Sequence, residues 1–181
     1  NKIKYFIILI MISFFSSNTS ADYDKLAYDF SFNDLDGTAL RLSDFKDNVI
    51  VVVNVASQCG FTKQYKDMQK IWMAYQSKGL IILGVPSNDF GNQEPGNNNE
   101  IKDFCETNFN IDFPISSKFD VKGKNAHPIY SWAKDNFGNS TIPKWNFHKI
   151  LINKNGKIQK TYGSFVNPMS KKITSEIEKI L

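Results

Sequence analysis

The residue with the clearest chemical potential is Cys59, which follows an apolar, β-branched run at 49–55 and precedes a stretch with helical spacing. A thiol at the start of a helix feels the partial positive charge of the helix N-terminus, and this charge favours the nucleophilic thiolate. A buried, unreactive cysteine is the alternative, because free cysteines often pack as small apolar side chains. Position alone leaves both interpretations open.

Two well-known cysteine motifs are absent around Cys59. A Cys-x-x-Cys reductase motif is excluded because Thr62 stands three residues after Cys59. The pattern Pro-x-x-x-Thr-x-x-Cys of peroxiredoxins is also absent, since Val52 and Ala56 occupy the places of its proline and threonine. If Cys59 carries out redox chemistry, it does so within a sequence motif other than these two.

Three ordered blocks of the chain combine Cys59 with amide and indole side chains. The blocks are Asn54 to Thr62 (NVASQCGFT), Phe90 to Gly96 (FGNQEPG) and Trp145 to Lys149 (WNFHK). The first resembles the active-site signature of the glutathione peroxidase family, with Cys where some animal members carry selenocysteine. The second resembles that family's Gln-Glu-Pro loop, and the third is similar to its Trp-Asn-Phe-x-Lys strand. The resemblance extends from about Tyr28 to the C-terminus.

This resemblance implies a thioredoxin-like fold and a catalytic set of Cys59, Gln93, Trp145 and Asn146. These residue types suit peroxide reduction, in which a thiolate attacks one oxygen and the other leaves as hydroxide or alkoxide. The indole N–H only donates, and Gln and Asn each carry an NH₂ donor. Such donors stabilise a thiolate and the charge that develops on the departing oxygen. The product is a Cys59 sulfenic acid, and the reaction needs no metal or organic cofactor.

The resemblance also implies a role for Cys105, which matches the position of the resolving cysteine in thioredoxin-dependent members. Many Cys-type members carry a further cysteine where this chain has Ser87. We therefore expect a Cys59–Cys105 disulfide that a thioredoxin-like protein reduces, with glutathione or another low-molecular-weight thiol less favoured. A packed core cysteine is the alternative, because Cys105 shares an apolar helix face with Ile101 and Phe104.

The proposed disulfide requires a movement of the segment around Cys105. A disulfide needs Cα atoms within about 4.4–6.8 Å, and a cysteine packed on its helix can lie well beyond that distance. Gly96, the asparagines at 97–99 and Asn108 predict a weak helix that can unwind locally.

The remaining sequence alternates between predicted strands and helices. The apolar, β-branched runs at 49–55 and 80–85 predict strands buried on both faces, as in a parallel sheet. Apolar spacing predicts helices around 65–75, 101–105, 129–133 and 173–181, and a short strand is expected at 113–115. Turn residues at 36–37 and 153–156 predict two hairpins, the first N-terminal and the second between strands at 147–152 and 157–162. These elements predict one α/β domain over 22–181, with a central mixed sheet flanked by helices.

Residues 1–21 have the layout of a secretory signal peptide. Lys2 and Lys4 precede an apolar run over 5–15, and the small residues Thr19 and Ala21 precede the expected cleavage site. The run is shorter than the roughly 18 residues that span a bilayer. We therefore expect cleavage, no stable membrane insertion and an exported protein, periplasmic or secreted, in a compartment where disulfides persist. An uncleaved anchor is the alternative.

Composition excludes several classes of protein. The 181 residues are 41% hydrophobic and 22% charged, which is typical of a globular domain and too apolar for disorder. The net charge of +4 drops to +2 without residues 1–21, and this value does not indicate binding to nucleic acid. Two Cys and two His are too few for a four-residue zinc site made of those residue types alone.

The resemblance also bears on the oligomeric state. The segment 126–144 is too short for the loop that supports tetramers in classical glutathione-using members of the family, so we expect a monomer.

Three functions remain open at this point. The favoured one is a thiol peroxidase that reduces hydrogen peroxide and organic hydroperoxides. A peroxide sensor that passes a disulfide from Cys59 to a partner protein would use the same residues. A non-catalytic thioredoxin-fold binding module would keep the three blocks as scaffold, and steady peroxide consumption with an added reductant separates it from the peroxidase.

Overall fold

A four-stranded mixed sheet forms the centre of the molecule, with strand order β4-β3-β5-β6. The computed structural model describes residues 23–181, so the predicted signal peptide at 1–21 lies outside the described residues. The strands are β3 (Val49–Val55), β4 (Leu80–Pro86), β5 (Lys149–Ile152) and β6 (Ile158–Tyr162). β3 and β4 run parallel, whereas β5 is antiparallel to both β3 and β6. The predicted mixed sheet is confirmed.

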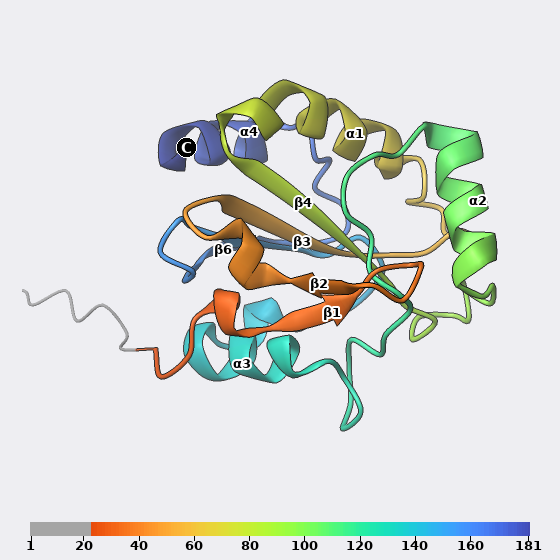
Figure 1. The fold of residues 1–181 in the computed structure, drawn as a ribbon, viewed down its shortest axis with the longest axis horizontal. Coiled ribbons are helices and arrows are strands. Elements are labelled where there is room, and N and C mark those ends of the chain that lie inside the picture. The colour runs from red at the N-terminus through yellow and green to blue at the C-terminus, as the bar shows by residue number, and fades with distance from the viewer. Residues whose placement is uncertain (1–22) are drawn as a thin grey trace, which may run out of the picture.

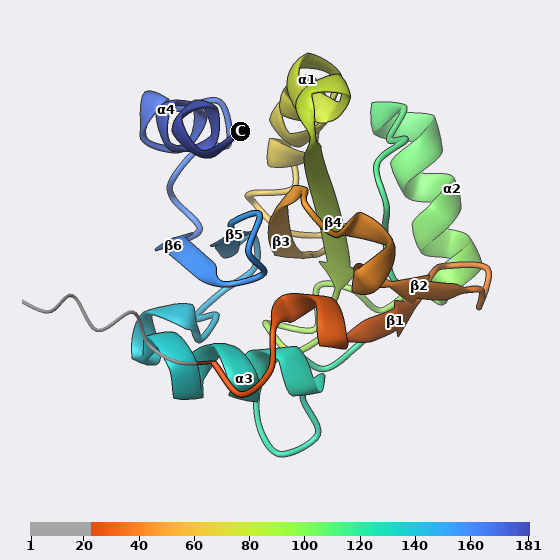
Figure 2. The same ribbon diagram turned by 60° about the vertical axis from the view of Figure 1, so that its left-hand side comes forward.

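Helices cover both faces of this sheet (Figures 1 and 2). The α-helices are α1 (Gln64–Tyr75), α2 (Asn98–Phe109), α3 (Pro128–Phe137) and α4 (Lys171–Ile180). The short 3₁₀ helices are η1 (Ala27–Asp29), η2 (Leu42–Phe45), η3 (Gln76–Lys78) and η4 (Asn139–Thr141). β1 (Ser31–Asn33) and β2 (Ala39–Arg41) form the predicted N-terminal hairpin as a separate two-stranded sheet. Within the described residues, no helix combines the length and the apolar character needed to cross a membrane.

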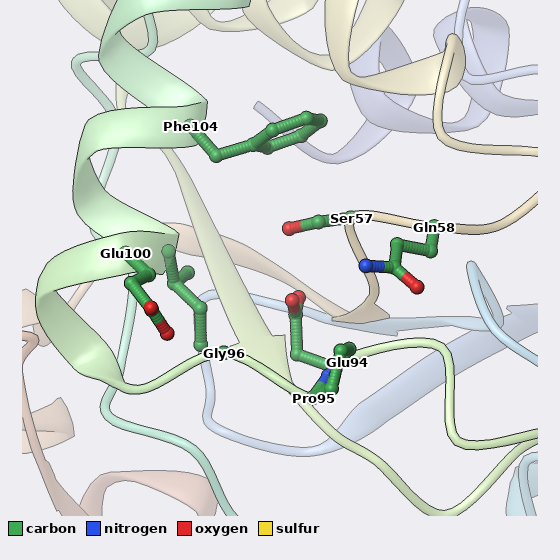
Figure 3. Close-up of a pocket in the computed structure, with 8 residues that line it drawn as sticks. Ser57, Gln58, Glu94, Pro95, Gly96, Glu100 and Phe104 are labelled. Atoms are coloured by element: carbon green, nitrogen blue, oxygen red, sulfur yellow. The ribbon is translucent and has the colours of Figure 1, made fainter.

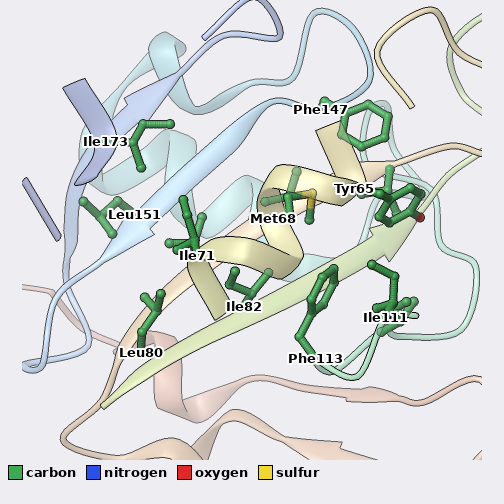
Figure 4. Packing of buried hydrophobic residues seen from close by; sticks show 14 of the residues in the cluster. Tyr65, Met68, Ile71, Leu80, Ile82, Ile111, Phe113, Phe147, Leu151 and Ile173 are labelled. Atoms are coloured by element: carbon green, nitrogen blue, oxygen red, sulfur yellow. The ribbon is translucent and has the colours of Figure 1, made fainter. Parts of the chain in front are cut away.

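The residues of β3 divide the core into two halves. Val51 and Val53 face a cluster built with α1, α2 and α4, and Figure 4 shows part of that packing. Ile50 and Val52 face a second cluster that contains side chains of α3 and the N-terminal segment. Every residue of β3 is buried because both faces of the sheet are covered, and this explains its continuous apolar run.

Two predicted strands are shorter than expected. The segment 113–115 contributes only a single parallel bridge between Ile115 and Gly84, because Pro114 lacks the N–H that a longer ladder would require. The strand predicted from residue 147 begins at Lys149, because Phe147 adopts a left-handed conformation with φ of 63°. The residues before this turn are held instead by Asn54 of β3, which bonds to the Trp145 carbonyl and to the Phe147 N–H.

The N-terminal segment is attached to the turn between β5 and β6. The Ala27 N–H donates to the Gly156 carbonyl at 2.9 Å, and the Tyr28 hydroxyl donates to the Lys154 carbonyl at 2.8 Å. Gly156 has φ of 74°, and a Cβ there would lie 2.9 Å from the Tyr28 ring. Since Ile152 pairs with Ile50, this turn lies at the start of β3, at the opposite end of the sheet from Cys59.

Candidate active site

Cys59 lies in the turn that connects the end of β3 to the start of α1. Thr62 fixes this turn, because its Oγ1 accepts from the Cys59 N–H at 3.0 Å and donates to the Ala56 carbonyl at 2.7 Å. The Phe61 N–H points at Cys59 Sγ at 3.4 Å. The sulfur is half-buried and reduced, and a backbone donor aimed at it suits a negatively charged sulfur.

Gln93 approaches this turn from the loop that follows β4. Gly91 and Asn92 have φ of 65° and 53°, and these two left-handed residues turn the chain just before Gln93. The Gln93 carbonyl then accepts from the Gln58 N–H at 3.0 Å, next to Cys59 in sequence. A Cβ on Gly91 would lie 3.3 Å from the Trp145 ring, so these two loops are in close contact.

Trp145 and Asn146 reach the same place from the segment before β5. The Asn54 Nδ2 donates to the Trp145 carbonyl at 3.0 Å, and the Phe147 N–H donates to the Asn54 carbonyl at 2.6 Å. The Asn146 Nδ2 donates to Gln93 Oε1 at 3.0 Å. This bond occupies the amide oxygen of Gln93, so the Gln93 NH₂ is left to serve as a donor.

The predicted set is therefore assembled at one end of the sheet. Gln93 and Asn146 are hydrogen-bonded, and Trp145 packs against the loop of Gln93 with 38% of its surface exposed. This group is connected to the Cys59 turn through Gln58. Within residues 23–181, no group of three His, Cys, Asp or Glu side chains is arranged to hold a metal ion.

Cys105 is separate from that group. It lies in α2, is 1% exposed, and has no disulfide partner. Burial raises the pKa of the Cys105 thiol to about 11, although the Tyr65 hydroxyl acts in the opposite direction. In this conformation Cys105 is a packed and unreactive thiol.

The start of α2 differs from the weak helix predicted for it. The Asn97 side chain accepts from the Glu100 N–H at 3.0 Å, and Glu100 Oε2 accepts from the Asn97 N–H at 2.7 Å. This reciprocal pair is a capping box, which stabilises a helix start. The asparagine run that indicated weakness therefore supplies the cap.

Two residues that support the site were not assigned a role from the sequence. The buried Asn54 holds the Trp145 segment, and the buried Lys149 donates to Gln64 Oε1 at 2.7 Å and to the Val166 carbonyl at 2.6 Å. Burial lowers the pKa of Lys149 to about 7. Asn54 is a polar residue inside an apolar strand sequence and Lys149 is the first residue of one, and this contrast is the signal that could have identified both.

Comparisons with known proteins agree with this geometry. The model of the glutathione peroxidase family matches residues 27–134. The chain is 42% identical over 170 residues to hydroperoxy fatty acid reductase gpx1 of Synechocystis sp., covering 90% of this chain and 99% of that protein. It is 41% identical over 158 residues to glutathione peroxidase-like peroxiredoxin 2 of Saccharomyces cerevisiae, covering 85% and 96%.

Solved structures show the same relationship. The crystal structure of T. cruzi GPX1 matches with a TM-score of 0.67 and 31% identity, over 86% of this chain and 96% of that chain. A thioredoxin-family thiol:disulfide interchange protein from Chlorobium tepidum TLS matches with a TM-score of 0.61 at 18% identity, over 83% and 92% of the two chains. This second likeness shows the thioredoxin-like fold alone. The family model and the relatives match this chain, and the three sequence blocks meet at one end of its sheet. The chain therefore belongs to the glutathione peroxidase family.

Proposed function

We propose that the chain is a thiol peroxidase that reduces hydrogen peroxide and organic hydroperoxides through Cys59. The observation that carries the proposal is the Asn146–Gln93 hydrogen bond, which orients the Gln93 amide beside the Cys59 turn. The printed names of the relatives, a hydroperoxy fatty acid reductase and a glutathione peroxidase-like peroxiredoxin, support the same chemistry.

The first step forms a sulfenic acid. The Cys59 thiolate attacks one peroxide oxygen, the O–O bond breaks, and the other oxygen leaves as hydroxide or alkoxide and takes up a proton. Gln93, Trp145 and Asn146 contribute the donors that stabilise charge on sulfur and on the departing oxygen. The reaction needs no cofactor, because sulfur itself is oxidised and peroxide is reduced.

The second step regenerates the thiols. Cys105 attacks the Cys59 sulfenic acid, and a thioredoxin-like protein reduces the resulting disulfide, with a low-molecular-weight thiol such as glutathione as the less favoured reductant. Ser87 supports the assignment of Cys105, because the other position where such enzymes carry cysteine is occupied by serine.

The proposal includes an exported monomer. The signal-like segment at 1–21 supports cleavage after Ala21 and a periplasmic or secreted location for the domain over 22–181. The short segment at 126–144 supports a monomer. The intact mass of protein recovered from the producing cell and light scattering in solution test these two statements.

A coupled assay tests the proposed function directly. The unmodified protein should consume hydrogen peroxide and a fatty acid hydroperoxide steadily with a thioredoxin, thioredoxin reductase and NADPH, and much more slowly with glutathione and its reductase. A single turnover without cycling in either system would contradict the peroxidase and favour a sensor. Absence of even that single turnover would favour a binding module.

The donors can be tested with single-turnover kinetics. Gln93→Ala and Trp145→Ala should each slow the peroxide step by about 100- to 1000-fold, which corresponds to the loss of one oxyanion-hole donor of about 2.7–4 kcal/mol. Gln58→Ala is the matched control, because it removes an exposed amide from the same region and keeps the backbone N–H that bonds to Gln93. If both donor variants react as fast as this control, the two blocks are scaffold.

A further inference from the structure

A pocket of about 460 Å³ lies between the two segments that carry the cysteines. Ser57 and Gln58, just before Cys59, line one side, and Ile101 and Phe104, just before Cys105, line the other. Figure 3 shows these walls, with Glu94 rising between them from the loop after Gln93. Cys59 and Cys105 themselves are not among the lining residues, so a disulfide between them requires α2 to move relative to the Cys59 turn.

Glu94 is the unexplained group in this pocket. It is 1% exposed, and its Oε2 has no hydrogen-bond partner among the described residues. The Ser57 hydroxyl lies beside the carboxyl (Figure 3). Burial raises the pKa of Glu94 to about 7, although Ser57 and Lys118 favour the charged form. A carboxyl of this kind both accepts and releases a proton near neutral pH.

The other charged or titratable groups near Glu94 are already used or cannot serve as the base. The Glu100 carboxylate caps α2, and Lys118 Nζ donates to the carbonyls of Glu94 and Gly96. Tyr65, on α1, interacts electrostatically with both Cys105 and Glu94, but burial raises the pKa of Tyr65 well above its usual range. Glu94 is therefore the group in this pocket suited to take a proton.

The step in which Cys105 attacks the Cys59 sulfenic acid needs a group that accepts a proton. The Cys105 S–H bond breaks, an S–S bond forms to Cys59, and the S–O bond of the sulfenic acid breaks; Cys105 sulfur is oxidised and Cys59 sulfur is reduced. Hydroxide leaves and must gain the proton that Cys105 loses, which gives water. In the packed helix, burial raises the pKa of the Cys105 thiol to about 11, so Cys105 starts this step as a protonated thiol.

We propose that Glu94 accepts the thiol proton of Cys105 as Cys105 approaches the Cys59 sulfenic acid, and returns it to the departing hydroxide. The proposal rests on the proposed peroxidase function. It explains why a buried carboxyl without a hydrogen-bond partner at Oε2 lies between the two cysteine-bearing segments.

Rapid-quench mapping separates the two steps. After one equivalent of hydrogen peroxide, dimedone labelling measures sulfenic acid and peptide mapping measures the Cys59–Cys105 disulfide. In Glu94→Gln, disulfide formation at pH 7.5 should slow by about 100-fold, the lower range for general acid–base catalysis, and far more than sulfenic acid formation. The rise in the disulfide rate as pH passes about 7 should disappear, because the variant has no carboxyl to ionise.

Two further variants make the test specific. Glu106→Gln is the matched control, since Glu106 is exposed, lies on α2 and also acts electrostatically on Cys105. It should resolve at the parent rate. Glu94→Asp keeps a carboxyl and should recover part of the lost rate and the inflection near pH 7.

Three outcomes would overturn the role of Glu94. They are parent-like resolution in Glu94→Gln, equal loss of both steps, and Glu94→Asp as slow as Glu94→Gln without an inflection. A failure of the proposed peroxidase function gives a different result from these three outcomes, because the unsubstituted protein itself would then form no sulfenic acid.

Discussion

Replacing Cys59 with serine is expected to abolish peroxide reduction and to leave the fold intact. A serine hydroxyl cannot accept the peroxide oxygen as a sulfenic acid, so we expect a loss of more than about 1000-fold, as for other enzyme nucleophiles. The fold should survive because the bonds between the turn and Thr62 use the backbone of Cys59 and the Thr62 hydroxyl.

Single-turnover peroxide consumption measures this effect, and near-ultraviolet circular dichroism checks the fold. Cys105→Ser is the internal control, because it removes the other thiol and should keep the first turnover. A rate within a few-fold of the parent in Cys59→Ser would show that another group reduces peroxide.

Replacing Cys105 with serine is expected to stop cycling after the first turnover. Cys105 is buried in α2 and does not take part in the Asn146–Gln93 hydrogen bond, so the peroxide step should change by less than about twofold. Thioredoxin-supported turnover should fall to background, because no intramolecular disulfide forms. Cys59 should then accumulate as sulfinic acid with excess peroxide, which mass spectrometry detects.

The effect of the Cys105 substitution on folding stability has to be distinguished from its effect on peroxidase cycling. A buried serine hydroxyl without a partner costs about 1–3 kcal/mol, and Cys105→Ala avoids that cost. Both variants should lose cycling to the same extent, whereas urea unfolding should distinguish them. Normal cycling of Cys105→Ala with thioredoxin would exclude the two-cysteine mechanism.

The elements with continuous apolar sequence could be predicted from the sequence. Val49–Val55 and Leu80–Pro86 are the two parallel strands because both faces of the sheet are covered, and the turn at 153–156 formed the expected hairpin. The three sequence blocks also indicated which residues meet at the site. These predictions depend on local composition or on resemblance, and both are visible without coordinates.

Features that depend on tertiary contacts could not be predicted in the same way. The left-handed turn at Phe147 depends on its hydrogen bond to Asn54, a residue far away in sequence. The burial of Glu94 depends on Ser57 and α2 closing over a polar loop, although its sequence neighbours are Gln and Pro. The low helix propensity of Asn97 predicts a weak helix, but at a helix start its side-chain acceptor has the larger effect.

The bond between Ala27 and Gly156 determines where anything joined to the N-terminus leaves the domain. From that end, β3 runs seven residues to the Cys59 turn, and at about 3.3 Å per residue the two ends lie roughly 20 Å apart. A tag, lipid or surface linker placed ahead of Tyr23 is therefore attached opposite the reactive sulfur. The protein can be immobilised through its N-terminus, on a bead or an electrode, with the Cys59 turn facing the medium.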